Sequence, residues 1–260
     1  MPRKTRDKRA KLKADTLARI DEAYANNEEM QEFYQREAVK TTFPVKDLNW
    51  TDRQKDFIKL SLDDETRIIL CTGPAGTSKT LISVYAALRL LSKKEISDIS
   101  YIRSAVESSD AKLGYLPGSA EEKLQFYNMP FLEKLDELLA PTHMKKLEKD
   151  ERISMFPVNF TRGMNWNARC IIFDEVQNSS LKEIITVLTR LGKKSKCFVL
   201  ADPMQTDLHR GTGGFEQLSK IFNDQESADM GIHTFEFTED DIMRSKLCKF
   251  LITKIKTIKA

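Results

Sequence analysis

Short hydrophobic runs alternate with amphipathic stretches along most of the chain. Runs of apolar, often β-branched residues are typical of strands that are buried on both faces of a sheet. We expect such strands over residues 67–71, 99–102, 153–158, 170–173, 197–200 and 232–237. Because stretches with helical spacing of apolar residues separate most of them, the pattern predicts an α/β fold with a mostly parallel sheet and helices on both faces.

The clearest local pattern is a strand, a loop of small residues and a helix between residues 67 and 91. The loop contains two glycines and a proline, and a Lys-Thr pair opens the helix. This is the layout of a P-loop, in which backbone N–H groups and a helix N-terminus bind phosphates. The residues expected to bind a nucleotide are Gly73, Pro74, Ala75, Gly76, Thr77, Ser78, Lys79 and Thr80.

Within this loop, Lys79 is expected to reach the β- and γ-phosphates and the Thr80 hydroxyl to ligate Mg²⁺. One position departs from the usual G-x-x-x-x-G-K-[ST] pattern, because Ser78 stands where the second glycine is expected. If the backbone needs a positive φ there, the serine costs roughly 1 kcal/mol of strain.

Acidic and amide residues follow two other predicted strands. Asp174 and Glu175 end the run over residues 170–173, which is typical of a Walker B motif. In P-loop enzymes such an aspartate holds Mg²⁺, and the neighbouring glutamate polarises the attacking water. Gln205 follows the run over residues 197–200. At the carboxyl end of a strand it is placed to orient that water or sense the γ-phosphate, although an ordinary turn glutamine is the alternative.

Two further polar residues have functional and structural interpretations. Arg103 directly follows the strand over residues 99–102, which favours phosphate contact with a nucleotide or a nucleic acid. Gln54 lies three residues after Thr51, a spacing that predicts a capping box at a helix start. The alternative is that Gln54 hydrogen-bonds the Hoogsteen edge of adenine.

Capping patterns place the remaining helices. Ser119 is expected to begin a helix that Pro130 splits in two, within a helical insertion over residues 104–150. A second helix is expected to begin after Ser180 and to end at Gly192.

A C-terminal helical segment is predicted over residues 240–258, with Arg244 at its start. Arg244 follows an acidic stretch, so a surface ion pair with Glu239 or Asp240 is one interpretation. The other is an arginine finger that acts in its own nucleotide site or in that of a neighbouring subunit.

Charge is distributed unevenly along the 260 residues, although the net charge is only +3. Seven of the twelve residues 2–13 are lysine or arginine, with Asp7 as their one acid, so they form either a solvated tail or an arm that contacts nucleic-acid phosphates. We therefore expect residues 1–40 to be a basic arm with a helical extension, and residues 41–260 to be the P-loop domain.

The four cysteines do not form a metal-binding or redox pair in sequence. Three lie at one end or the other of an apolar strand, where a free thiol behaves as a small buried hydrophobic group, and this favours a reducing, cytoplasmic compartment. No apolar run approaches the length of a membrane span, so no membrane partner is expected.

Taken together, these motifs resemble those of the PhoH-like proteins, a family of P-loop ATPases related to superfamily 1 helicase cores. The resemblance covers residues 41–260 and rests on GPAGTSKT (73–80), YIRSAVES and KLGYLPG (101–118), TRGMNWN and IIFDEVQN (161–178), ADPMQTDL (201–208) and FTEDDIMRS (237–245). This chain departs from the family pattern at Ser78, Val176 and Ala201, which affects the fine geometry of the nucleotide site.

The resemblance implies a RecA-like fold, ATP with Mg²⁺, and RNA or single-stranded DNA as a partner. It also implies homo-oligomers, for example a hexameric ring in which Arg244 reaches a neighbour's nucleotide. Arg103, Arg162 and the basic arm would then face the nucleic acid.

The leading hypothesis is an ATPase that couples hydrolysis to nucleic-acid binding, most plausibly RNA, with helicase activity supplied only by an oligomer. Lys79, Asp174, Glu175, Gln205 and Arg244 would form its catalytic set. Two alternatives stay open. A nucleotide-gated module would bind RNA or protein without motor activity, and a small-molecule phosphotransferase would have no need for Glu175 or the basic arm.

Overall fold

The computed structural model describes residues 42–103, 120–206 and 214–259. The predicted basic arm, the proposed helix start at Ser119 and the SAVES and KLGYLPG segments lie outside these residues. Within them, no helix combines the length and the hydrophobicity needed to cross a bilayer.

The framework is a six-stranded sheet in the order β3-β2-β4-β5-β1-β6, and every neighbouring pair is parallel. The strands are β1 Ile68–Thr72, β2 Asp98–Arg103, β3 Ile153–Pro157, β4 Arg169–Asp174, β5 Lys196–Ala201 and β6 Ile232–Glu236. This confirms the six predicted strands and the α/β class. The strand β5 separates β1 from β4, so the P-loop strand and the Asp-Glu strand are not neighbours, as a RecA-like sheet requires.

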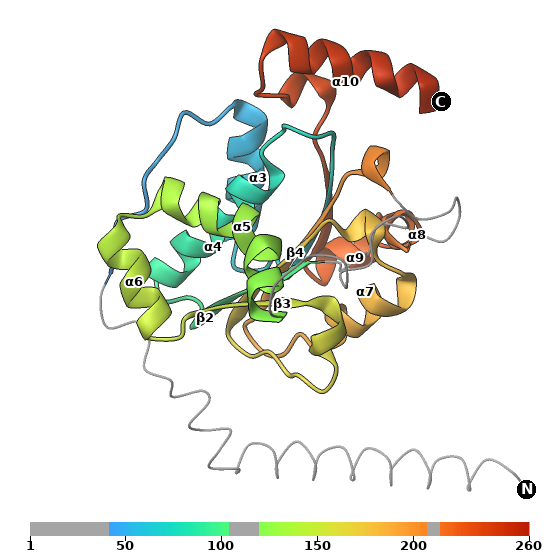
Figure 1. The fold of residues 1–260 in the computed structure, drawn as a ribbon. Helices are drawn as coiled ribbons and strands as arrows, with labels where there is room; N and C mark the ends of the chain where they lie inside the picture. Colours follow the sequence, from blue (N-terminus) through green and yellow to red (C-terminus); the bar gives the residue numbers. More distant parts are fainter. Residues whose placement is uncertain (1–41, 104–119, 207–213, 260) are drawn as a thin grey trace, which may run out of the picture. The chain divides into compact units, whose positions relative to one another are not determined.

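Helices cover both faces of the sheet, as predicted (Figure 1). One face carries α3 Asp52–Leu62, α4 Lys79–Ser92, α5 Ala120–Leu138 and α6 Pro141–Lys149. The other carries α7 Leu181–Leu188 and α8 Phe215–Ile221. Within the described residues, the remaining helices are α9 Gln225–Asp229, α10 Lys246–Lys259 and the 3₁₀ turns η2 Val158–Thr161, η3 Val176–Asn178, η4 Pro203–Gln205 and η5 Glu239–Asp241.

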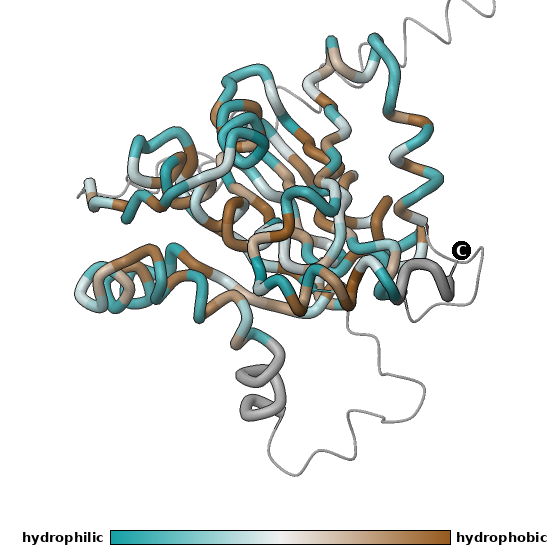
Figure 2. Tube along the Cα trace, turned by 90° about the horizontal axis from the view of Figure 1, so that it is seen from above, coloured by the Kyte–Doolittle hydropathy of each residue, from teal (hydrophilic) through white to brown (hydrophobic). Residues whose placement is uncertain are grey.

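The alternation of side chains along each strand divides the core into two hydrophobic layers. Ile69 of β1 and Ile172 of β4 face the layer under α3, α4, α5 and α6. Their neighbours Leu70 and Ile171 face the layer under α7 and α8. Figure 2 shows hydrophobic residues concentrated toward the interior of the fold. The sheet is therefore buried on both faces, and its carboxyl edge is free to form a site.

Three helix predictions were wrong. Pro130 does not split its helix, because α5 runs continuously through it. The buried side chains of Phe131, Leu135 and Leu138 lie on one helical face, and their burial outweighs the hydrogen bond that proline removes.

The helix α7 ends at Leu188 rather than at Gly192. Gly192 instead donates its N–H to Trp166 O at 2.6 Å, and a Cβ at this position would lie 2.0 Å from Asn167 Oδ1. The C-terminal helix also begins later than predicted, at Lys246, so Arg244 precedes it.

Candidate phosphate-binding site

The loop between β1 and α4 has the compact backbone of a phosphate-binding loop, and this backbone is strained at one residue. Ser78, directly before α4, has φ +66° and ψ 23°, which is the left-handed region. The serine therefore occupies a conformation that favours glycine, and the strain expected for a positive φ applies. Gly76 also has a positive φ of +84°. Thr77 is fully buried and donates from Oγ1 to Pro74 O at 2.9 Å, which closes the loop on itself.

Lys79 folds back over the loop that precedes it. Its Nζ donates to Gly73 O at 2.6 Å and to Pro74 O at 3.0 Å. Gly73 itself packs against the end of β6, where an added Cβ would lie 2.7 Å from Phe237 Cβ. The ammonium group thus lies at the mouth of the loop, where it could exchange carbonyl oxygens for phosphate oxygens.

A cleft of about 440 Å³ lies over this loop at the carboxyl edge of the sheet. The predicted site residues that line it are Ala75, Gly76, Ser78, Lys79, Thr80, Asp174, Glu175, Gln205 and Arg244. Lys134 and Glu137 of α5 form part of the same wall, so the helical insertion contributes to the cleft. The fold therefore brings together four motifs that are distant in sequence.

The carboxylate of Asp174 joins the end of β4 to the P-loop helix. Its Oδ2 accepts hydrogen bonds from Thr80 Oγ1 at 2.9 Å and from Tyr101 OH at 3.0 Å, and its Oδ1 accepts the Glu175 N–H at 3.0 Å. Burial raises the pKa of Asp174, and the nearby charge of Glu175 raises it further, whereas these hydrogen bonds oppose the shift. A buried carboxylate beside a threonine hydroxyl is a donor set that suits Mg²⁺.

Glu175 is held from two sides. Gln177 Nε2 donates to its Oε2 at 2.5 Å, and Arg103 Nη2 lies 3.9 Å from its Oε1. The backbone of Glu175 is left-handed, with φ +56°. Such a conformation persists only where its surroundings enforce it, and it is common at functional sites.

The end of β5 is tied to the same group. Gln177 Oε1 accepts the Asp202 N–H at 2.9 Å, so one buried amide side chain connects Glu175 to β5. Asp202 Oδ1 accepts the Met204 N–H at 3.0 Å, whereas Oδ2 is buried without a hydrogen-bond partner among the described residues. Burial raises the pKa of Asp202, and the Lys79 charge partly offsets this. An unsatisfied carboxylate oxygen beside the cleft fits a bound ion or water.

Gln205 is exposed at the end of η4 and lines the cleft. Its backbone N–H donates to Asp202 O at 2.9 Å, which fixes the turn that carries it. This position is compatible with the predicted role in orienting water, and that role stays a prediction.

Arg244 lies at the P-loop of its own chain. The N–H of Met243 donates to Gly76 O at 3.0 Å, and a Cβ on Gly76 would lie 2.9 Å from Arg244 Cγ. The acids proposed as surface partners bind other groups. Asp240 pairs with Lys249 at 3.5 Å, and Glu239 Oε2 accepts a hydrogen bond from Thr253.

Gln54 is buried and forms the capping box of α3. Its N–H donates to Thr51 Oγ1 at 3.2 Å, and its Oε1 accepts the Thr51 N–H at 3.0 Å. It does not line the phosphate cleft. The structural interpretation is therefore observed, and adenine recognition stays a prediction.

The two arginines expected to face nucleic acid lie in different places. Arg103 ends β2 beside Glu175. Arg162 is exposed after η2 and lines a separate cleft of about 180 Å³ between η2 and α7. The structure thus places Arg103, but not Arg162, next to the catalytic candidates.

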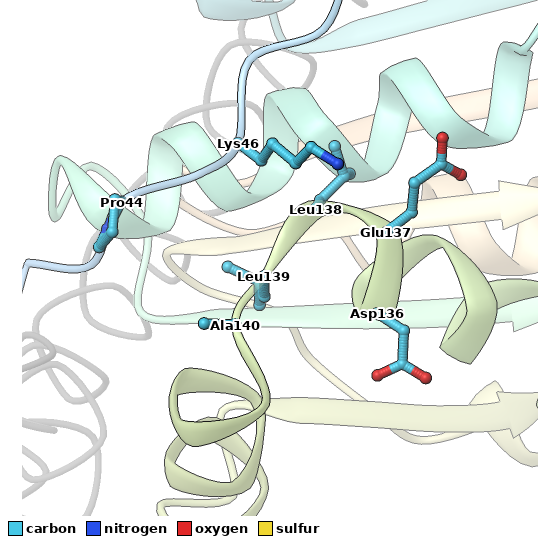
Figure 3. Close-up of a pocket in the computed structure, with 7 residues that line it drawn as sticks. All are labelled: Pro44, Lys46, Asp136, Glu137, Leu138, Leu139 and Ala140. Carbon is cyan, nitrogen blue, oxygen red and sulfur yellow. The ribbon is translucent and has the colours of Figure 1, made fainter.

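A third hollow, of about 390 Å³, lies between residues 44–46 and the end of α5 (Figure 3). Its lining residues include two acids, Asp136 and Glu137, and one base, Lys46. Because this charge balance disfavours a phosphate chain, the hollow does not compete with the cleft over the P-loop.

Sequence reasoning missed three residues of the site, namely Tyr101, Gln177 and Asp202. Tyr101 lies within an apolar strand pattern that gives no sign of a functional role, although its hydroxyl contacts Asp174. Gln177 and Asp202 belong to the DEVQN and ADPMQTDL segments, so their presence in family motifs was the available signal.

The fold and the cleft define a P-loop protein of the RecA-like α/β class. A family model described as PhoH-like protein matches residues 48–256. The chain belongs to the PhoH-like protein family.

Curated relatives agree with this assignment. A PhoH-like protein of Mycobacterium tuberculosis strain H37Rv is 33% identical over 190 residues, which cover 73% of this chain and 53% of the relative. A PhoH-like protein of Synechocystis is 31% identical over 203 residues, which cover 78% of this chain and 60% of the relative. Protein PhoH of Escherichia coli K12 is 31% identical over 189 residues, covering 72% and 52%. The chain thus spans about half the length of the curated relatives it matches.

Among solved structures, one of two coordinating Pif1 helicases that unwind forked double-stranded DNA gives a TM-score of 0.34 at 16% identity. The match covers 74% of this chain and 44% of that chain. At this TM-score the likeness is too weak to bear on function.

Proposed function

We propose that this protein binds ATP with Mg²⁺, hydrolyses it, and couples hydrolysis to the binding of RNA or single-stranded DNA. The observation that carries the proposal is the 2.9 Å hydrogen bond between Thr80 and Asp174. It joins the P-loop helix to the Asp-Glu strand end, and Glu175 lies directly beside it. A phosphate site and a candidate base for water therefore share one cleft.

Each residue has a role that follows from its place. The P-loop N–H groups and Lys79 bind the phosphate chain. Thr80 and Asp174 would hold Mg²⁺, which, when bound, neutralises charge that develops on the phosphate oxygens. Glu175 accepts a proton from the attacking water, because Gln177 and Arg103 fix the position of its carboxylate.

Gln205 and Arg244 would complete the catalytic set from the other rim of the cleft. Gln205 orients the attacking water, and Arg244 stabilises negative charge in the transition state. Because Arg244 already lies over Gly76, the chain's own site is the first place where it would act. Gln54 stays a proposed adenine contact beside its capping role.

Nucleic acid would approach along the carboxyl edge of the sheet. Arg103 at the end of β2 and Arg162 after η2 supply positive charge there, and the basic residues 2–13 would add a phosphate-binding arm. The described residues form one RecA-like lobe. Helicase activity would come from a homo-oligomer, for example a hexameric ring, working in the cytoplasm.

A nucleotide-gated binding module is the second candidate. Ser78 strains the P-loop with φ +66°, and Glu175 is held by Gln177 and Arg103. If the engaged carboxylate of Glu175 does not accept the proton of water, ATP would only set a binding state.

Phosphate release from ATP and Mg²⁺ tests the proposal, measured with and without single-stranded RNA or DNA at low and moderate salt. We expect stimulation by nucleic acid that weakens as salt rises and that Lys79→Ala abolishes. Turnover indifferent to nucleic acid would remove the coupling, and ATP binding without turnover would favour the gated module.

A further inference from the structure

The 3₁₀ turn η2 presents an aromatic ring to solvent while its neighbours are buried. Phe160 is 66% exposed, whereas Val158 is 3% and Thr161 0% exposed. Because three residues make one turn of a 3₁₀ helix, residues 158 and 161 share a face and residue 160 lies on another. Thr161 Oγ1 also donates to Val158 O at 2.7 Å. The backbone under the ring is therefore anchored, and the ring stays accessible.

Two exposed cations line the cleft beside η2. Asn159 and Arg162 flank Phe160 in sequence, and both line the cleft of about 180 Å³ that Lys182 of α7 borders from the other side. Arg162 and Lys182 are exposed. The acid that lines the same cleft, Glu183, is engaged, because its Oε2 accepts hydrogen bonds from the N–H and the hydroxyl of Ser180, both at 2.8 Å.

The turn η2 lies at the carboxyl edge of the sheet, as the phosphate cleft does. Pro157, which precedes η2, is the register partner of Arg103, and Arg103 is the register partner of Asp174. Four strand spacings separate β3 from the P-loop strand β1, which is about 19 Å along the edge. Phe160 thus lies on the same edge as the phosphate cleft but outside it.

We propose that Phe160, with Arg162 and Lys182, forms a stacking subsite for a base of single-stranded nucleic acid. An exposed aromatic ring whose neighbours in sequence line a cleft with two cations suits the alternating bases and phosphates of a single strand, whereas a duplex hides its base faces. The inference rests on the proposed coupling to nucleic acid, and it names where one unpaired base would be bound.

Fluorescence anisotropy of labelled single-stranded RNA and DNA oligonucleotides tests the site, with duplexes of the same sequence as a second probe. We expect Phe160→Ala to weaken single-strand binding roughly 5- to 150-fold, the range for losing one base–aromatic stack. Phe160→Trp should bind as tightly as the native chain, and its added fluorescence should be quenched by the oligonucleotide.

Met230→Ala is the matched control, because Met230 is 70% exposed but lies before β6, at the amino edge of the sheet. It should leave binding unchanged. Phosphate release without nucleic acid should be unchanged in all three variants, since none of these residues lines the phosphate cleft. Arg162→Ala should reduce the slope of log Kd against the logarithm of the salt concentration by about one, because one phosphate contact is lost.

Three results would overturn the subsite. First, Phe160→Ala could bind single strands like the native chain. Second, Phe160→Trp could lose binding as Phe160→Ala does, which would indicate a structural role for Phe160. Met230→Ala could weaken binding equally, which indicates a nonspecific effect. Failure of the native chain to bind any nucleic acid is a different outcome, because it removes the proposed coupling itself together with the subsite.

Discussion

The Thr80 hydroxyl donates a 2.9 Å hydrogen bond to Asp174 Oδ2, and these two residues are 94 positions apart in sequence. Thr80 is the second residue of α4, and Asp174 ends β4. Because β5 lies between β1 and β4, the contact spans the gap between two strands that do not pair. It fixes the distance between the phosphate loop and the carboxylates that would act on the bound nucleotide.

Replacing Thr80 should separate metal binding from phosphate binding. We expect Thr80→Ala to raise the Mg²⁺ concentration for half-maximal ATP hydrolysis at least roughly tenfold, because it removes a ligand and a donor to Asp174. Thr80→Ser keeps the hydroxyl and should stay close to the native value. Titration of Mg²⁺ at saturating ATP measures this, and equal curves for both variants would exclude the hydroxyl from the metal site.

Glu175→Gln should abolish turnover without abolishing ATP binding. The amide cannot accept the proton of the attacking water, so we expect hydrolysis to fall roughly 10²- to 10⁴-fold. ATP affinity should stay near the native value, because the phosphates bind to the loop and to Lys79. Single-turnover hydrolysis and equilibrium binding of ATP measure the two effects. Glu216→Gln, at an exposed position of α8, is the control, and unchanged turnover in Glu175→Gln would remove the base role.

Gln177 is predicted to position Glu175 rather than to contact the nucleotide. Gln177→Glu keeps an acceptor for the Asp202 N–H but loses the donor to Glu175 Oε2. We expect kcat to fall, by up to roughly 100-fold, because the new carboxylate repels that of Glu175 and displaces the base. The KM for ATP should change much less, since the phosphates bind to the loop and to Lys79.

Gln217→Ala, exposed on α8, controls for the loss of a glutamine elsewhere. If Gln177→Glu raises KM and leaves kcat unchanged, Gln177 shapes the nucleotide pocket instead.

The local pattern of hydrophobic residues was sufficient to predict the strands and the polar residues that follow them. A parallel strand that is buried on both faces reads as a continuous apolar run, so β4 and β5 were predictable from their residues alone. The polar residues that follow such runs, Asp174 and Glu175, were predictable because ligands gather at the carboxyl edge.

What the sequence did not reveal depends on strand order and packing. Tyr101 contacts Asp174 only because β2 pairs with β4, with Tyr101 opposite Ile172, and no local pattern encodes that neighbour. Pro130 stays inside α5 because of tertiary burial around it, which propensity does not include. The placement of Arg162 at a separate cleft also follows from β3 lying at the edge of the sheet.

The strain at Ser78 predicts a stabilising substitution. Because Ser78 has φ +66°, Ser78→Gly should raise the free energy of unfolding by about 1 kcal/mol. Ser219→Gly, within the helix α8, should instead destabilise by about 0.5 to 1 kcal/mol, since glycine is unfavourable there. Urea denaturation measures both. A Ser78→Gly variant that is no more stable than the native chain would mean that hydrogen bonding at the serine offsets the strain.

Asp174 should make stability depend on pH when Mg²⁺ is absent. Burial and Glu175 raise its pKa above the ordinary value of 3.8, so folding favours the neutral carboxyl. This contribution is complete below pH 3.8 and is lost as pH rises through the elevated folded pKa. Asp174→Asn removes the titration, so its free energy of unfolding should fall less than that of the native chain across this window.

Denaturation in the presence of a chelator, at a series of pH values, measures how steeply the free energy of unfolding changes with pH in each protein. The hydrogen bond that the amide alters shifts the whole curve of Asp174→Asn equally at every pH, so it does not affect this slope. At neutral pH, added Mg²⁺ should stabilise the native chain, because the cation favours the charged carboxylate, and should have little effect on Asp174→Asn. Parallel pH curves for the two proteins would show that Asp174 titrates alike in the folded and unfolded chains. Its burial would then not be what prepares it to hold a cation.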